Sequence, residues 1–281
     1  MGAAVFEKVL SEIDQNRDFI KVIVLYHGGE PLLNRNFYKM VAQIKSINNN
    51  IFVKTVSNGM ALTKKNAENI LSSRIDMIEF SLDGESSDES QYVRVESNTR
   101  QIISNIKALL SLKKSRDAAK PDIYIATTQF LRGQNLAGLP GEPAVPTWLE
   151  QLFDGEVSGY KPTYAIKWPH MGNSGKFDFF KPVGGSDSDE CDHLINTLTV
   201  RADGSVVPCC YDLTSKLVMG NILEESLTDI WNGPKYSVLR QSIKSKKYIS
   251  ICATCAVVRP PVYLVPKWHV IPVVKIEKNN S

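Results

Sequence analysis

The stretch Tyr26–Leu33, with the sequence YHGGEPLL, follows a strand-like run and decides how the first half of the chain is interpreted. The run before it, Phe19–Tyr26, predicts a strand because it is rich in branched apolar residues and ends at two glycines. Two later strand-like runs end in similar residues, at Ser57-Asn58-Gly59 and Ser81-Leu82-Asp83-Gly84. Three such ends in a row indicate a ligand-binding edge of a sheet, although turn formation alone also favours these residues.

Strand-like and helix-like segments alternate along this part of the chain. The predicted strands after the first are Ile51–Val56, Ile75–Leu82, Asp122–Phe130 and Tyr164–Trp168, and amphipathic helical spacing precedes or separates them. Such alternation predicts an α/β fold with a parallel sheet covered by helices. In sheets of this kind the functional groups gather at the C-terminal ends of the strands.

The composition is that of an ordinary globular protein. The chain has 281 residues with 43% hydrophobic and 22% charged residues, enough for one large domain and a small additional unit. A formal net charge of +3 is too small to indicate nucleic acid as a partner. No apolar run is long enough to span a membrane, and Met1–Asp14 has no features of a secretory signal. We therefore expect a cytoplasmic protein, in whose reducing surroundings clustered cysteines more often bind metal than form disulfides.

All five cysteines lie in the last third of the chain. Cys191 precedes a predicted β-hairpin that turns at Asp203-Gly204, and Cys209 follows that hairpin. Cys252 and Cys255 form a C-x-x-C pair later in the chain. These four thiols predict one metal centre, for which spacing alone allows either zinc or an iron–sulfur cluster. A redox pair or simply packed cysteines are the alternatives.

The fifth cysteine, Cys210, is expected to stand outside this centre. Neighbouring side chains of an extended segment point to opposite faces, so Cys209 and Cys210 are not expected to bind the same metal. We interpret Cys209 as the ligand and Cys210 as a packing residue.

The three strand ends together resemble the radical S-adenosylmethionine (radical SAM) family. The stretch Tyr26–Leu33 resembles the family's GGEP motif, and the strand ends at residues 57–59 and 81–84 resemble its next ones. The resemblance implies S-adenosylmethionine (SAM) as a cofactor, with its amino group held at the GGEP turn. The residues implied in cofactor binding are Gly28, Gly29, Glu30, Pro31, Asn58, Ser81 and Arg94.

The last third resembles the SPASM or twitch module of the same family. Cys191, Gly204 and Cys209 match the start of its pattern, Asn221–Trp231 resembles its helix, and the C-x-x-C pair completes it. The resemblance implies one auxiliary [4Fe–4S] cluster held by Cys191, Cys209, Cys252 and Cys255.

The expected architecture follows from both resemblances. Residues 1–171 are expected to form a partial TIM-like (β/α)6 barrel that lacks its first strand. A linker is expected at 172–188, a SPASM-like iron–sulfur module with a β-hairpin and helices at 189–258, and a C-terminal tail at 259–281.

One element of the family pattern is missing. Its radical-generating cluster is held by a C-x-x-x-C-x-x-C loop, which should precede the helix containing Phe6 and Ile13, but no cysteine occurs before Cys191. We therefore expect either a fragment or a shortened relative of an enzyme that modifies a peptide or small-molecule precursor, inactive for radical generation as given. A reductant protein is a further expected partner. The alternatives are a non-catalytic [4Fe–4S] electron-transfer protein and a zinc-stabilised binding module.

Overall fold

The first half of the chain folds around a five-stranded parallel sheet. The computed structural model describes residues 1–94, 96–132, 140–169, 171–172 and 175–268. The strands pair in chain order, each parallel to the next, as β1 (Val22–Val24), β2 (Phe52–Ser57), β3 (Met77–Ser81), β4 (Asp122–Gln129) and β5 (Gly159–Tyr164). The C-terminal ends of all five strands therefore share one edge.

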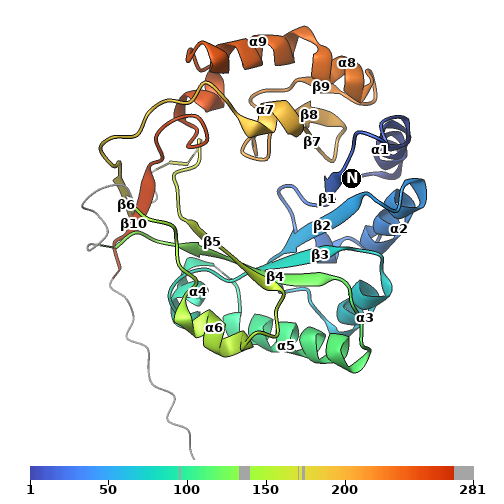
Figure 1. Ribbon diagram of the computed structural model, residues 1–281, viewed down its shortest axis with the longest axis vertical. Coiled ribbons are helices and arrows are strands. Elements are labelled where there is room, and N and C mark those ends of the chain that lie inside the picture. The colour runs from blue at the N-terminus through green and yellow to red at the C-terminus, as the bar shows by residue number, and fades with distance from the viewer. Residues whose placement is uncertain (95, 133–139, 170, 173–174, 269–281) are drawn as a thin grey trace, which may run out of the picture.

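Helices lie on the outer side of the curved sheet, as Figure 1 shows for α2, α3, α5 and α6. In chain order the helical elements of this half are α1 (Ala3–Gln15), the 3₁₀ turn η1 (Pro31–Leu33), α2 (Phe37–Ile47), α3 (Lys64–Ser72), α4 (Ser87–Val93), α5 (Thr99–Ser115) and α6 (Thr147–Phe153). None of the helices in the described part of the chain combines the length and apolar character that a membrane crossing requires.

The sequence periods explain why these elements form. In β2 every second residue is buried, with Val53 and Thr55 directed at the helices and Lys54 at the other face. In α5 the buried residues fall at helical spacing, and the side chain of Asn98 caps the helix by accepting from the Gln101 N–H. One apolar core between sheet and helices results, with the fully buried Phe80 among its largest side chains.

The cysteine-bearing part forms a small module of its own. Its elements are α7 (Asp192–Asn196), β7 (Thr199–Val200), β8 (Ser205–Val207), β9 (Gly220–Asn221), α8 (Leu227–Asn232), α9 (Pro234–Lys244) and the 3₁₀ helix η3 (Ser250–Thr254). The hairpin β7–β8 and the helix pair confirm the sequence prediction for this region, whereas β9 was not expected. Figure 1 shows the module across the hollow side of the sheet from the helices.

The module is tied to the first half by α1. The carboxylate of Glu12, which is 1% exposed, accepts a hydrogen bond from the backbone N–H of Leu227 at 2.9 Å and an ion pair from Lys8 at 2.6 Å. A buried carboxylate at the first residue of α8 satisfies an N–H that the helix itself leaves unpaired. The N-terminal helix thereby anchors the module to the rest of the chain.

Two segments expected to be irregular form a further sheet. Within the expected linker lies β6 (Phe177–Phe180), which pairs antiparallel with β10 (Tyr263–Pro266) in the expected tail. Each strand is only four residues long and follows a stretch rich in glycine, serine or proline, so neither gives a clear sequence signal. Neither strand was predicted from the sequence, and residues 173–174 and 269–281 lie outside the described residues.

The strand bounds also differ at the end of the sheet. Tyr164–Trp168 was expected to be the last strand, but β5 runs over Gly159–Tyr164. The strand Gly159–Tyr164 gives a weak sequence signal, since it contains a glycine and a proline, which are depleted in strands. The parallel sheet itself, and hence the partial barrel-like architecture, is as expected from the sequence.

Candidate functional site

The carboxylate of Glu30 joins the ends of the first two strands. Its Oε1 accepts from the Ser57 hydroxyl at 2.8 Å and the Leu32 N–H at 3.0 Å, and its Oε2 accepts from the Asn58 N–H at 2.8 Å. Glu30 was expected to contact the methionine part of a cofactor. In this structure both of its oxygens hold the chain's own loops, so its role is to fix the strand-end geometry.

The two glycines before Glu30 leave their surroundings open. Gly28 has φ +64° and a Cβ placed on it, or on Gly29, would meet no atom within 4 Å. Within the described residues, the backbone N–H and C=O groups of both glycines take part in no hydrogen bond of the fold. This turn therefore offers free backbone donors and acceptors to a ligand, as the GGEP interpretation requires.

The other predicted cofactor residues lie along the same edge, with their polar groups partly in use. Arg94 forms an ion pair with Asp83 at 2.8 Å, and Asp83 also accepts from the Thr128 N–H at 2.8 Å. The Asn58 side chain accepts from the Met60 N–H at 2.9 Å in a local turn. Ser81 is the last residue of β3 and is half-buried. Arg94 still has a buried Nε with no partner among the described residues, so its guanidinium is not saturated.

The four predicted metal ligands lie within electrostatic reach of one another in the module. Burial, and then the charges that Cys255, Cys209 and Cys191 would carry as thiolates, raise the pKa of the Cys252 thiol to about 12. Burial likewise raises the pKa of Cys209 to about 12, with Cys255 among the neighbours that oppose its ionisation. The four thiols thus oppose one another's ionisation, although they come from residues far apart in sequence.

A cation suits this group of thiols. Each thiol is half-buried or buried and the five cysteines form no disulfide. Metal binding requires the thiolate form, which the surroundings disfavour unless a positive centre compensates the charge. In the described part of the chain, no three His, Cys, Asp or Glu side chains are gathered as tightly as a single metal ion requires. By its chemistry, a donor set of four thiols suits an iron–sulfur cluster or zinc.

The loop after β8 meets the loop after β1. The imidazole of His27 lies close to the backbone of Cys210, and burial lowers the pKa of His27. Its Nε2 is buried with no hydrogen-bond partner among the described residues. The strand end that carries the two glycines is thus in direct contact with the residue next to the predicted ligand Cys209.

An aromatic contact supports the same junction. The ring of Tyr211 lies 4.7 Å from that of Trp168, which follows β5, and 5.7 Å from that of His193 in α7. Thr254, between the two cysteines of the C-x-x-C pair, donates to the Pro169 carbonyl at 3.3 Å. Both ends of the parallel sheet therefore contact the cysteine module.

Charged residues line the sheet face that the helices leave free. Glu79 in β3 is held by Lys54 and Lys161. Burial opposes the ionisation of Glu79, but hydrogen bonds from the two lysines outweigh it and lower its pKa. The carboxylate is thus ionised at neutral pH.

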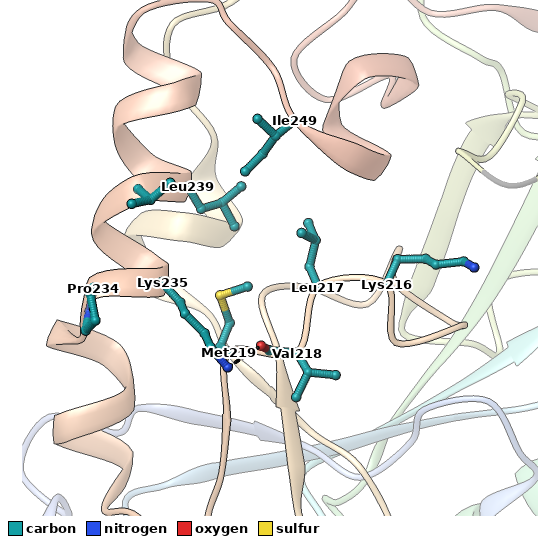
Figure 2. Close-up of a pocket in the computed structure, with 9 residues that line it drawn as sticks. Lys216, Leu217, Val218, Met219, Pro234, Lys235, Leu239 and Ile249 are labelled. Atoms are coloured by element: carbon teal, nitrogen blue, oxygen red, sulfur yellow. Dashed lines mark hydrogen bonds between the residues drawn. The ribbon is translucent and has the colours of Figure 1, made fainter.

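An apolar groove of about 360 Å³ lies on the module itself, between the segment before β9 and helix α9 (Figure 2). Its only polar contact in that view runs from the Lys235 ammonium to the Val218 carbonyl at 3.1 Å. It is lined by aliphatic residues and two lysines, with no acid, histidine or nucleophile. The groove is therefore not the candidate site, which lies at the sheet edge and the cysteines.

Some residues of the site were not found from the sequence. His27 is a lone histidine beside two glycines, and its partner Cys210 is known only from the fold. Lys54 and Glu79 did carry a signal, because each interrupts an apolar strand on the face opposite the core. His170, a lone histidine that follows Trp168 and Pro169 in the sequence, lies outside the described residues.

Two family models match the chain in the regions just described. The radical SAM superfamily model matches residues 3–125, and the SPASM model, described as an iron–sulfur cluster-binding domain, matches residues 191–256. The chain belongs to the radical SAM superfamily and carries a SPASM domain. The first match covers α1 and the strand ends of β1 to β3, and the second contains all five cysteines.

Two characterised relatives are similar to this radical SAM chain. The S-adenosyl-L-methionine-dependent 2-deoxy-scyllo-inosamine dehydrogenase of Niallia circulans is 36% identical over 62 residues, which is 21% of this chain and only 25% of that protein. The tungsten-containing aldehyde ferredoxin oxidoreductase cofactor-modifying protein of Pyrococcus furiosus is 23% identical over 285 residues, covering 89% of this chain and 78% of that protein.

Solved structures share its fold. The crystal structure of BtrN in complex with AdoMet and 2-DOIA matches with a TM-score of 0.55 at 18% identity, covering 91% of this chain and 80% of that one. The structure of anSMEcpe with bound AdoMet and Kp18Cys peptide matches with a TM-score of 0.53 at 14% identity, covering 90% and 80%. At such identities the likeness concerns the fold alone.

The Glu30 bridge gives a test of the strand-end geometry. Replacing Glu30 by Gln leaves one of three donors facing an amide N–H₂ instead of an oxygen, so we expect the free energy of unfolding to fall by about 1–2 kcal/mol. Hydrogen exchange at the Asn58 amide should also accelerate. Urea unfolding and hydrogen–deuterium exchange measure the two effects.

The control for this variant is Glu7→Gln on the exposed side of α1, where no bridging contact is made. Equal stability of the two variants, with unchanged exchange at Asn58, would show that the Glu30 bridge does not hold the strand ends together.

Proposed function

We propose that this protein holds one auxiliary [4Fe–4S] cluster through Cys191, Cys209, Cys252 and Cys255 and binds SAM at the neighbouring sheet edge. The main support is that four thiols, which are far apart in sequence, converge beside the loop that contains Gly28 and Gly29. When bound, such a cluster supplies electron transfer or a substrate-binding iron, while the protein positions the reacting groups.

The family match favours iron–sulfur over zinc. A tetrahedral zinc ion with Zn–S bonds of 2.3 Å brings its four sulfurs to about 3.8 Å from one another. An iron–sulfur cluster is a larger body whose ligands stand farther apart. The match of residues 191–256 to an iron–sulfur cluster-binding domain supports the cluster, and the distances between the four sulfurs in the loaded protein distinguish the two centres.

The SAM site is proposed at the C-terminal ends of β1, β2 and β3. Gly28 and Gly29 offer free backbone groups for the amino group, in a turn that Glu30 and Pro31 hold in shape. Asn58 and Ser81 are proposed to meet the ribose or carboxylate, and Arg94 the carboxylate, for which a guanidinium is well suited. Binding by Arg94 would compete with its present ion pair to Asp83.

The proposed substrate is a peptide or a small molecule in a reducing cytoplasm. Similar folds have been solved with 2-DOIA in BtrN and with the Kp18Cys peptide in anSMEcpe. The substrate would lie between the sheet edge and the cysteine module, because His27 and Tyr211 bring these two parts into contact.

We do not propose that this chain alone generates a radical. Reductive cleavage of SAM needs a cluster with an open iron, and no cysteine precedes Cys191. We propose that the 281 residues bind SAM without cleaving it, and that a segment with C-x-x-x-C-x-x-C alongside β1 would confer cleavage. In support, Val22 and Val24 of this edge strand are 52% and 40% exposed.

The ligand assignment is tested by a matched pair of serine variants. After anaerobic reconstitution the protein should carry about four iron and four sulfide per chain. Cys209→Ser should lose most of the iron and of the brown absorbance, because it removes a ligand. Cys210→Ser should retain both, because Cys210 is not one of the four proposed ligands.

Iron and sulfide analysis with visible spectra gives the answer. If Cys209→Ser retained its iron and Cys210→Ser lost its iron, Cys210 would be the ligand and Cys209 the packing residue. Stoichiometric zinc with no visible absorbance would favour the zinc-stabilised binding module instead.

The SAM proposal is tested by separating binding from cleavage. The reconstituted chain should bind SAM in equilibrium dialysis yet yield no 5′-deoxyadenosine with dithionite. A fusion that adds a C-x-x-x-C-x-x-C segment before Met1 should yield it. Cleavage by the chain alone would contradict the proposal, and failure of the chain to bind SAM would favour a non-catalytic electron-transfer protein.

A further inference from the structure

The inner face of the parallel sheet carries one cluster of charges in its middle. The strand register directs Lys54, Glu79 and Lys161 to the same face, opposite to the helices, although they come from β2, β3 and β5. The face on which the helices pack is by contrast apolar around this level, with Val53, Ile78 and Ile125. The cluster is therefore not a by-product of an all-polar sheet.

One carboxylate oxygen holds both lysines. The Oε1 of Glu79 lies 3.0 Å from the Lys54 ammonium and 2.5 Å from the Lys161 ammonium. To reach it, Lys161 crosses over β4 and passes 5.2 Å from the centre of the Tyr124 ring. Gly159 makes this possible, since a Cβ there would come within 2.7 Å of the Tyr124 ring.

The cluster has an excess of positive charge. Two ammonium groups face one carboxylate, and within the described residues neither Lys54 nor Lys161 forms an ion pair with any other acid. Each ammonium has three N–H donors: Glu79 engages one of each lysine and the Met77 sulfur a second of Lys161 at 3.7 Å, so two donors of Lys54 and one of Lys161 remain. The Glu79 side chain is only 8% exposed, whereas Lys54 and Lys161 are 26% and 37% exposed.

The cluster lies beside the candidate site. Tyr26, at the end of β1, is within electrostatic reach of both Glu79 and Cys210. The charged cluster and the loop next to the predicted ligand Cys209 therefore flank the same tyrosine. A molecule that lay between the sheet edge and the cysteine module would be able to extend one group toward the lysines.

We propose that Lys54 and Lys161 form an oxyanion subsite, in which the shared Glu79 holds the two ammonium groups side by side and a carboxylate or phosphate of the substrate binds them. The assignment of this oxyanion to a substrate rests on the proposed function, but the binding of an anion does not. It narrows the substrate class to peptides or small molecules with a free acidic group.

The position of Glu79 between the two lysines predicts the direction in which anion affinity changes when Glu79 is replaced. Glu79 competes with an incoming anion for the same donors, so removing its charge should strengthen anion binding rather than weaken it. A purely structural ion-pair cluster predicts no gain of anion binding on Glu79→Gln.

Anion binding is tested by titrating the full chain with sodium phosphate and, separately, with sodium acetate at constant ionic strength. The readout is NMR of ¹³C-labelled lysine side chains. We expect Lys54→Gln and Lys161→Gln each to weaken binding about fivefold or more, and Glu79→Gln to tighten it about fivefold, since one unit of charge changes beside the anion in each case. Lys107→Gln, on the exposed side of α5, is the control and should leave the affinity unchanged.

The two anions separate the possible sources. Binding of phosphate alone points to a phosphorylated substrate, and binding of acetate alone or of both supports a carboxylate-bearing one. No saturable binding of either, or weaker binding by Glu79→Gln that is folded by circular dichroism, would overturn the subsite. If Glu79→Gln does not fold, unchanged affinity in both lysine variants overturns it equally.

Measuring the chain with and without reconstituted iron keeps the two proposals apart. Anion binding that persists while iron cannot be incorporated contradicts the cluster and leaves the subsite standing. Full iron content without anion binding contradicts the subsite and leaves the cluster standing.

Discussion

The contact between His27 and the backbone of Cys210 joins two parts of the chain that have separate cores. One part is the C-terminal edge of a parallel sheet, where SAM is proposed to bind, and the other is the cysteine module. Because the imidazole also has a buried Nε2 without a partner among the described residues, this contact is not a saturated packing interface. An unpaired buried acceptor costs free energy unless a ligand, water or partner satisfies it, and such costs are typically retained at functional positions.

On one side of this contact, the Glu30 carboxylate holds the strand ends together instead of being presented to a ligand. Glu30 accepts three hydrogen bonds from the loops after β1 and β2, which fixes the glycine turn beside it. The free groups at this edge are then backbone groups of Gly28 and Gly29, whose positions do not depend on a side-chain rotamer. On the other side, the thiols gain their ionised form only with a cation. A rigid, open turn and a group of thiols that ionise only beside a cation therefore face each other across the contact between His27 and Cys210.

The sequence predicted the parallel sheet, the strand ends, the β7–β8 hairpin and the α8–α9 pair, because each depends on local period or on turn residues such as Gly204. It did not predict β6 and β10, whose pairing connects two short segments far apart in sequence. The bridge from Lys161 to Glu79 was equally hidden, since it crosses a strand and depends on register. Sequence motifs thus identified which residue types the site needs, while the long-range contacts that orient them came only from the fold.

The central claim is that four thiols beside the His27 contact hold one iron–sulfur cluster. Anomalous diffraction at the iron edge, from crystals of the anaerobically reconstituted chain, tests it most directly. We expect one compact group of four irons, each within bonding distance of one of the sulfurs of Cys191, Cys209, Cys252 and Cys255, with the sulfur of Cys210 bonded to none of them. A module without an iron peak, or with a peak at the zinc edge in its place, would contradict it.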